Sequence, residues 1–559
     1  MNHPVRALAL ALLAALAAPL AAQSFPITAI DPSGEGEFPG SRGPDQMIVY
    51  TPAYDHPTTG TNPWGSEAVV SGGVVVSVGT NDSAIPEDGF VVSGHGVARD
   101  WINTNLAPGY PVIHDGTEVR IDDSPAGQFA LLMWRLGDLR SRLDALAASG
   151  APAETLGGLR AAIDDLENLI YLSPGVAMDQ RAEEAREIES AIWDLELGQI
   201  PSPEGEVRGV WHRLSETTPG AITQLVEELE AAHVNAFFPE TIYGSQAIFA
   251  DETGLYPLFQ HFEGHDALAQ IIEECHARGI EVHAWVHCFF IGVQGNQDEP
   301  PLLAESHPQW LQSDREGRQV SIDEADYMFI NPAQPEVRRA LIDAYVSLVE
   351  RYDLDGLQLD YIRYPNHQSW QRGWDYSEFT RTQVTRDLDF DPMEIAPDTH
   401  PEQWARWLAW REGVITSFVE EASGAIRAAR PEIFLSADIF PGIEYAVEVK
   451  GQNWADWGQR GLVDAIIPMA YTTDPADVAD AVSEMHRLLP EAGPFAIALG
   501  PFLGLSPRQL IDQIRAARGA SSTGQILFCW DRLTPEARRA LALGPWRSGG
   551  APDWMEESL

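Results

Sequence analysis

Short apolar runs rich in β-branched and aromatic residues alternate with amphipathic stretches from Glu206 to about Leu543. Such runs are typical of buried strands, and apolar positions three and four residues apart are typical of helices. The predicted strands cover residues 207–211, 235–239, 281–287, 356–361, 433–439, 465–470, 495–499 and 525–530. The predicted helices begin near Ile222, Asp266, Pro335, Trp404, Val478 and Pro507. Eight strands with intervening helices predict an α/β fold, a closed (β/α)₈ barrel of the TIM type, over residues 205–545.

Two different patterns precede the predicted barrel. Residues 25–122 are rich in Gly, Pro, Asp and Val, and their short alternating runs are divided by turn clusters such as Gly72-Gly73. This pattern predicts a small, mostly β accessory domain. Residues 126–198 have helical periodicity, which predicts a helical hairpin with a connector helix. A proline-broken linker leads into the barrel, and residues 546–559 are expected to form a C-terminal tail.

The chain begins with an apolar leader. Arg6 precedes an Ala/Leu run that extends to about Leu20, and the small residues Ala21 and Ala22 follow. This arrangement is typical of a secretory signal peptide, so we expect removal of residues 1–22 and export to the periplasm or the extracellular space. No later segment reaches the roughly 18 apolar residues that a membrane-spanning helix needs, so we expect no membrane insertion.

The charge and the cysteine content limit the classes of function that we expect for this protein. The formal net charge is −47 at pH 7, and Lys450 is the only lysine. Such an acidic surface would repel nucleic acids, whose binders need clustered Lys and Arg, so we expect no nucleic-acid partner. The three cysteines lack metal-type spacing, and the barrel region lacks a Gly-rich nucleotide motif. We therefore expect neither a metal site nor a cofactor.

Polar and aromatic side chains stand at the predicted carboxyl ends of the strands, where the reacting groups of a (β/α)₈ barrel lie. Hydrolysis of a glycosidic bond needs a carboxylic acid that protonates the leaving oxygen and a carboxylate that attacks the anomeric carbon or activates water. It also needs a surface on which sugar rings can stack. The candidate catalytic carboxyls are Asp360, Asp438 and Glu240. The candidate substrate-binding residues are Trp211, His287, Arg363, Tyr471 and Trp530.

Several of these residues have structural alternatives. Asp360 and Arg363 could form a loop salt bridge; otherwise Arg363 would hold a carboxylate ionised or bind an anionic group of the substrate. Asp438 could be a capping or turn aspartate, and His287 could be a hydrogen-bonded core group. Glu240 could be the acid or a ligand of a sugar hydroxyl.

The predicted barrel resembles the glycosyl-hydrolase-like family 10 domain, through matching stretches that follow the expected order from Glu206 to about Leu543. These stretches are residues 206–211, 279–285, 331–338, 352–365, 410–411 and 461–471. The resemblance implies a (β/α)₈ fold and hydrolysis of an O-glycosidic bond, with a bacterial cell-wall glycan as one substrate type. At the amino-terminal side, residues 85–96 resemble the start of a phosphodiester-glycosidase-type domain. That segment is too short for the whole enzyme, so we expect an accessory role.

The fourth predicted strand also resembles the chitinase signature, in which a Glu acid stands two residues after an Asp. Ile362 occupies that place after Asp360, so the proton donor is expected from another strand end. We expect Asp438 to be this donor, with Glu240 in reserve, and Asp360 to be the nucleophile or charge stabiliser.

The main hypothesis is therefore an exported glycoside hydrolase with a polysaccharide or oligosaccharide substrate. The alternative is a catalytically weak barrel that binds carbohydrate as an adaptor of the cell envelope. Retaining and inverting mechanisms, and endo and exo action, stay open at this point.

Overall fold

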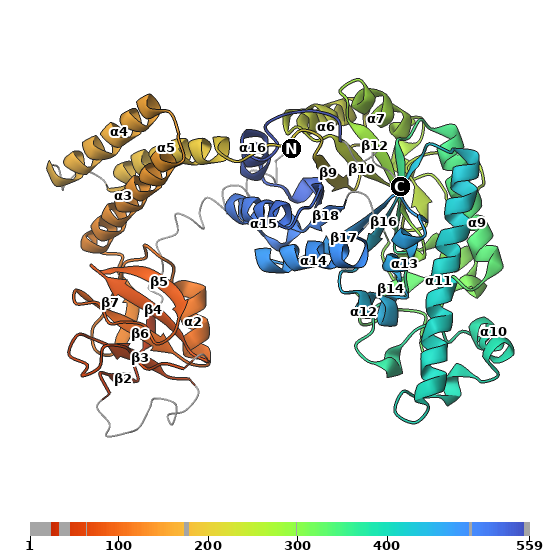
Figure 1. Cartoon of the computed structure of the whole chain (residues 1–559), viewed down its shortest axis with the longest axis horizontal. Coiled ribbons are helices and arrows are strands. Elements are labelled where there is room, and N and C mark those ends of the chain that lie inside the picture. The colour runs from red at the N-terminus through yellow and green to blue at the C-terminus, as the bar shows by residue number, and fades with distance from the viewer. Residues whose placement is uncertain are drawn as a thin grey trace. The chain divides into compact units, whose positions relative to one another are not determined.

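The computed structural model describes residues 24–32, 45–62, 64–172, 178–297, 299–490 and 495–552. The predicted signal segment, residues 1–22, and the end of the predicted tail lie outside these residues. The chain divides into two compact units, one through Gln199 and the other from Ile200 (Figure 1). Within the described ranges, no helix combines the length and the apolar character that crossing a membrane would require.

The first unit contains two small sheets and four helices among its described residues. One sheet has the order β2 (Ala29–Ile30), β3 (Met47–Tyr50), β6 (Gly89–Gly94), β4 (Ser66–Ser71) and β5 (Val74–Thr80). The other has the order β1 (Ser24–Pro26), β8 (Glu118–Ile121) and β7 (Val112–His114). The helices are α2 (Val97–Asn105), α3 (Pro125–Ala148), α4 (Ala153–Leu172) and α5 (Met178–Gly198). The β4–β5 hairpin turns at Gly72 and Gly73, which have φ of 57° and 82°.

The second unit is a closed parallel barrel, and all eight predicted strands are confirmed. They are β9 (Val207–His212), β10 (Ala236–Tyr243), β12 (Glu281–His287), β15 (Gly356–Asp360), β16 (Phe434–Ile439), β17 (Ala465–Ala470), β18 (Ala496–Leu499) and β19 (Gly524–Phe528). Neighbours in this order pair in parallel, and β19 pairs with β9 to close the ring. A short strand, β11 (Gln246–Ala247), extends β10 in the antiparallel sense.

Helices follow the barrel strands, and the six predicted helices are present. They are α6 (Pro219–Ala231), α7 (Ala267–His276), α9 (Pro335–Arg351), α11 (Pro401–Ala429), α14 (Pro475–Leu488) and α15 (Pro507–Gly519). Two shorter helices, α13 (Trp454–Gln459) and α16 (Pro535–Leu543), complete the alternation. Several begin where a capping side chain precedes a proline, as Ser506 does before α15, because proline suits the first helical position.

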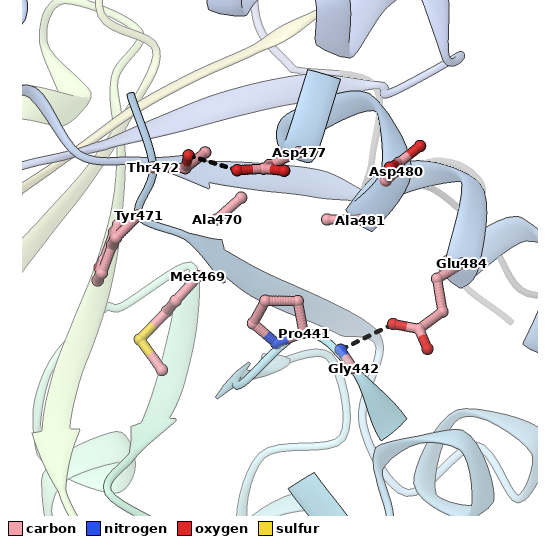
Figure 2. Close-up of a pocket in the computed structure, with 10 residues that line it drawn as sticks. All are labelled: Pro441, Gly442, Met469, Ala470, Tyr471, Thr472, Asp477, Asp480, Ala481 and Glu484. Carbon is pink, nitrogen blue, oxygen red and sulfur yellow. Dashed lines mark hydrogen bonds between the residues drawn. The ribbon is translucent and has the colours of Figure 1, made fainter. Parts of the chain in front are cut away.

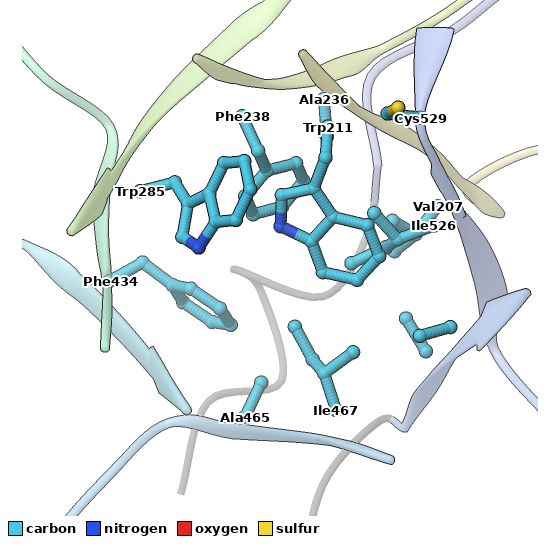
Figure 3. Packing of buried hydrophobic residues seen from close by; sticks show 12 residues of the cluster. Val207, Trp211, Ala236, Phe238, Trp285, Phe434, Ala465, Ile467, Ile526 and Cys529 are labelled. Atoms are coloured by element: carbon cyan, nitrogen blue, oxygen red, sulfur yellow. The ribbon is translucent and has the colours of Figure 1, made fainter. Parts of the chain in front are cut away.

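The barrel interior is filled by apolar side chains from most of the strands, as Figure 3 shows. Trp211 and Trp285 are its largest members, and the two indole centroids lie 6.4 Å apart. Smaller residues such as Ala465 and Ala496 face these rings, so that large and small side chains interdigitate. This packed layer forms the floor beneath the carboxyl ends of the strands.

Insertions with helices or strands of their own follow β12, β15 and β16, at the carboxyl end of the barrel. The first contains β13 (Phe290–Val293), α8 (Leu302–Ser306), η3 (Pro308–Trp310) and β14 (Tyr327–Phe329). The second contains η4 (Trp370–Arg372), α10 (Glu378–Leu388) and η5 (Pro392–Glu394). The third contains α12 (Ile443–Tyr445) and a π-helical turn, η6 (Ala446–Lys450). Shorter turns are η2 (Gln260–Phe262) after β10, η7 (Pro501–Leu503) after β18 and η8 (Trp530–Arg532) after β19.

Gly356 allows close packing at the start of β15. A Cβ atom there would lie 2.0 Å from His283 Nδ1 and 2.7 Å from the carbonyl oxygen of Phe434. Gly356→Ala should therefore lower the free energy of unfolding by about 1–3 kcal/mol, the usual cost of overpacking. Thermal unfolding followed by circular dichroism tests this. Gly424→Ala in α11 is the control, because its Cβ meets nothing within 4 Å and alanine favours helices. Equal melting temperatures for the two variants would contradict the packing argument.

Candidate active site

A cavity of about 240 Å³ lies at the carboxyl ends of the barrel strands. It is lined by Trp211, Arg213, Glu240, Trp285, His287, Tyr327, Asp360, Tyr361, Arg363, Asp438, Phe440, Met469, Tyr471 and Phe528. The structure thus brings together the three predicted carboxyls and four of the five predicted binding residues. Trp530 is not among the lining residues.

Asp360 and Asp438 occupy equivalent positions on neighbouring strands. Leu359 of β15 pairs with Ala437 of β16, so the next residue of each strand is one of the two aspartates. Parallel strands lie about 4.8 Å apart, and both side chains line the cavity. The strand register therefore places two carboxyls side by side.

Asp360 is held as a hydrogen-bond acceptor. Trp285 Nε1 donates to Asp360 Oδ2 at 3.0 Å, and the backbone N–H of Tyr361 donates to Oδ1 at 2.6 Å. Tyr361 has a φ of 51°, so the backbone turns sharply at the point where the strand ends. Burial raises the pKa of Asp360, and the charge of His287, the Tyr361 N–H and Arg363 act in the opposite direction. The pKa of Asp360 therefore stays above its usual value, but these contacts limit the rise.

Asp438 has a different environment. Its side chain is 2% exposed, and Oδ1 has no hydrogen-bond partner among the described residues. Burial, and then the negative charge of Asp360, raise the pKa of Asp438 well above its usual value. When two neighbouring carboxyls cannot both ionise, the less well solvated one keeps the proton. Asp438 is therefore the carboxyl of the pair that holds a proton more readily.

Glu240 is ionised, in contrast to Asp438. His287 Nε2 lies 2.9 Å from Glu240 Oε1, and Arg213 Nη2 donates to the same oxygen at 3.1 Å. Arg213 Nε also donates to Oε2. Burial alone would raise the pKa of Glu240, but His287 and Arg213 outweigh it and lower that pKa. Glu240 is thus suited to accepting hydrogen bonds rather than to donating a proton.

Arg363 pairs with an acidic residue outside the predicted set. Its Nη2 donates to Glu324 Oε1 at 2.6 Å, in the segment before β14. The guanidinium carbon lies 4.7 Å from the centre of the Tyr361 ring and 5.2 Å from that of Phe440. Arg363 is therefore fixed in the cavity wall, where its charge also acts on Asp360.

The predicted aromatic residues differ in position. Tyr471 lines the cavity and packs on Phe502 and Phe528, with ring centroids 5.2 and 5.8 Å away. Trp211 also lines the cavity, but it is 1% exposed and belongs to the barrel core. Trp530 lies in η8, where the Arg538 guanidinium carbon stands 4.0 Å from its ring centre.

Sequence reasoning missed several residues that line the cavity. Phe440 could have been found, because alternation along β16 turns every second residue to the same side as Asp438. The position of Arg213, directly after the last residue of β9, was a weaker indication that this residue lines the cavity. Tyr327 comes from the β13–β14 hairpin, and no strand-end pattern points to that hairpin.

A second cavity, of about 450 Å³, shares Met469 and Tyr471 with the first. Two of the carboxylates that line it, Asp477 and Glu484, accept hydrogen bonds from neighbouring groups (Figure 2). Thr472 Oγ1 donates to Asp477 at 2.7 Å, and the Gly442 N–H donates to Glu484 at 2.7 Å. These acidic groups therefore stabilise the loops beside the first cavity.

The first cavity places two carboxyls side by side, Asp438 with the more strongly raised pKa, and surrounds them with aromatic rings. This combination can deliver a proton and stabilise positive charge at neighbouring points, as acid-catalysed cleavage of an acetal requires. In the part of the chain that the structure describes, no group of three or more His, Cys, Asp or Glu could hold a metal ion.

Comparison with known proteins identifies the relationship of the barrel. The family described as glycosyl hydrolase-like 10 matches residues 206–490. Glycosyl hydrolase YngK of Bacillus subtilis is 24% identical over 229 residues, which are 37% of this chain and 39% of that protein. Glycosyl hydrolase DigH of Escherichia coli K12 is 21% identical over 243 residues, 37% of this chain and 46% of that protein. The match thus spans less than half the length of these relatives.

Two solved structures align with about three fifths of this chain. The glycoside hydrolase domain of PgaB (BpsB) from Bordetella bronchiseptica is 13% identical, with a TM-score of 0.49, covering 62% of this chain and 100% of that chain. The catalytic domain of β-amylase from Paenibacillus polymyxa is 12% identical, with a TM-score of 0.46, covering 60% of this chain and 95% of that chain.

The raised pKa of Asp438 predicts a pH-dependent stability. The folded protein binds this proton more tightly than the unfolded chain, so wild type loses stability as pH rises from the unfolded pKa, about 4, through the higher folded pKa. Asp438→Asn removes that loss. Its melting temperature should exceed that of wild type by an amount that grows as pH rises above about 5.

The control is Asp464→Asn, at the opposite end of the barrel. Asp464 accepts hydrogen bonds from the Leu435 N–H and from Arg427, both at 2.8 Å. Its substitution should lower the melting temperature throughout that pH range. A melting temperature of Asp438→Asn that tracks wild type at every pH would show that Asp438 is not protonated in the folded protein.

Proposed function

The chain belongs to the glycosyl hydrolase-like 10 family, and we propose that it is an exported glycoside hydrolase that cleaves O-glycosidic bonds of a polysaccharide. The observation that carries this proposal is the pair of buried carboxyls at the ends of β15 and β16, one with two hydrogen-bond donors and the other with an unpaired Oδ1. The family and the barrel support a carbohydrate-active protein. The proposal that it hydrolyses a glycosidic bond rests on Asp360 and Asp438.

In this proposal Asp438 is the general acid. Its carboxylic proton passes to the glycosidic oxygen as the bond to the anomeric carbon breaks, and the leaving sugar departs as an alcohol. Asp360 faces the positive charge that develops at the anomeric carbon, either as nucleophile or as charge stabiliser. Asp438, once ionised, can then take a proton from the incoming water.

The other cavity residues would bind the sugar. Glu240, kept ionised by Arg213 and His287, would accept hydrogen bonds from sugar hydroxyls. Tyr471 presents a ring to the cavity, and Arg363 keeps a positive charge near Asp360. Water is displaced from such a lined cavity when a ring enters, which strengthens these polar contacts.

The prediction for activity concerns the two aspartates. Asp360→Asn and Asp438→Asn should each lower kcat by about 10²- to 10⁴-fold, the range expected for loss of an acid–base or charge-stabilising group. The measurement is release of reducing ends from peptidoglycan with its peptides, from glycan strands freed of peptides, and from a panel of other polysaccharides. Asp464→Asn, which changes an aspartate at the opposite barrel end, should keep wild-type turnover per folded molecule.

Unchanged turnover in folded Asp360→Asn would contradict the role of Asp360 as nucleophile or charge stabiliser. Binding of a glycan by wild type without release of reducing ends would favour the carbohydrate-binding adaptor of the cell envelope. A bacterial cell-wall glycan is the proposed substrate type, because family resemblance and an amino-terminal leader both point to the cell envelope.

Export is proposed from the leader sequence at residues 1–22. Expression of the full chain in a bacterial host should yield a mature protein outside the cytoplasm that begins close to Gln23. Amino-terminal sequencing of the purified protein checks this. An intact amino terminus on protein that stays in the cytoplasm would contradict export.

A further inference from the structure

An aromatic cavity of about 440 Å³ lies beside the candidate active site. Its walls come from the loop and η4 turn after β15, from the start of α11, and from the α12–η6 turn after β16. We call it the aromatic cavity and define it by Trp370, Tyr376, Trp404, Trp407, Tyr445 and His367. None of the residues assigned to catalysis or sugar binding above lines it.

The aromatic rings of this cavity are held in place by other groups. Trp370 and Trp404 meet edge to face, with centroids 5.6 Å apart and an interplanar angle of 76°. The Arg315 guanidinium carbon stands 5.1 Å from the Trp370 ring centre, and Arg315 is fixed by hydrogen bonds to the carbonyl oxygens of Pro392 and Met393. Both tryptophans are only half-buried, and Tyr445 is 41% exposed. Ordered rings with open surface are suited to stacking on an apolar face.

The polar groups of the cavity suit hydroxyls rather than charged ligands. Glu444 and Glu448 lie exposed at its edge and can accept hydrogen bonds. Burial, with the charges of Arg411 and Lys450, lowers the pKa of His367 to about 4, so this imidazole is neutral at pH 7. Arg411 also lines the cavity, but its guanidinium is engaged by the carbonyl oxygens of Glu448 and Val449. Aromatic faces beside hydroxyl-binding groups match the two sides of a pyranose ring.

One shared wall separates this cavity from the candidate active site. Phe440 lines the active-site cavity and Tyr445 lines the aromatic one, and their ring centroids are 6.0 Å apart. Lys450, the single lysine of the chain, supports this wall with its Nζ 4.5 Å from the Phe440 ring centre and 5.8 Å from that of Tyr445.

Hydrogen bonds also connect the two cavities. Glu324 accepts from Arg363 of the active-site cavity and, at 2.8 Å, from the backbone N–H of Asn366. The Asn366 side chain in turn accepts from the Tyr445 hydroxyl at 2.7 Å. A glycan that extends out of the active-site cavity past this wall would reach the aromatic cavity next.

We propose that the aromatic cavity is a distal subsite that binds a pyranose ring of the glycan whose bond is cleaved beside Asp360. The inference rests on the proposed function and deepens it: the substrate is a glycan long enough to occupy both cavities. Cleavage then falls within a chain, at a fixed number of rings from the ring that stacks in the aromatic cavity.

The test compares two tryptophans of the same helix. Trp404 and Trp410 are both half-buried on α11 and pack on the same apolar cluster, but Trp404 lines the aromatic cavity and Trp410 does not. Binding is measured calorimetrically, in the Asp360→Asn background, with glycan strands freed of peptides and with chitin disaccharide, tetrasaccharide and hexasaccharide. Cleavage of the same probes is measured with Asp360 intact.

We expect Trp404→Ala and Tyr445→Ala to weaken binding of the longest probes about tenfold, the loss of one stacked ring, and to leave the disaccharide unaffected. Trp410→Ala should behave as the parent, and Tyr445→Phe should keep most of the affinity because it keeps the ring. Equal losses in Trp404→Ala and Trp410→Ala, equal losses for short and long probes, or no binding of any probe would overturn the subsite.

The outcome also separates the two proposals. Tight, Trp404-dependent binding of long glycans without cleavage would support the subsite and contradict the hydrolase. Cleavage of long glycans that is unaffected by Trp404→Ala and Tyr445→Ala would support the hydrolase and contradict the subsite.

Discussion

The hydrogen-bonded register between β15 and β16 is the constraint on which the site depends. Because Leu359 pairs with Ala437, two carboxyls end neighbouring strands at the same level of one cavity. The aspartates share burial but not partners, since Trp285 and the Tyr361 N–H both donate to Asp360 while Asp438 Oδ1 has no partner among the described residues. Proximity raises the energy of the doubly ionised state, and the unequal partners decide which carboxyl keeps the proton.

The surrounding structure makes this arrangement rigid. The barrel core beneath the cavity includes Trp211 and Trp285, so the indole that donates to Asp360 is itself anchored by packing. Glu240 is paired with Arg213 and His287, and the same His287 lies close enough to Asp360 to counteract the rise of its pKa. Buried charged groups such as these make a protein less stable than apolar side chains in the same place would. Destabilising groups of this kind are typical of functional sites.

Much of the fold follows from local pattern. The eight strands were predictable because parallel barrel strands are short, apolar and separated by helices with clear capping residues, as at Ser506. The same rule placed Asp360, Asp438 and Glu240 at one end of the barrel. Short helices such as α13 were not predicted, because six residues give too little periodicity to recognise.

Other features depend on contacts between distant segments and leave little trace in a local pattern. Arg363 pairs with Glu324 from the preceding insertion rather than with an aspartate three residues away, and Tyr327 enters the cavity from the same insertion. Trp530 follows the last strand in sequence, but the η8 turn sets its ring beneath Arg538. The aromatic cavity likewise combines residues after β15 with residues after β16, which only tertiary folding brings together.

Infrared difference spectroscopy of the carboxyl groups at pH 7 tests the central claim most directly, because a protonated carboxylic acid has a C=O stretch that a carboxylate lacks. The wild-type spectrum should contain a carboxylic-acid band that disappears in Asp438→Asn and persists in Glu240→Gln. A wild-type spectrum in which Asp438→Asn removes no such band would show that Asp438 is ionised, and the division of roles between Asp438 and Asp360 would be wrong.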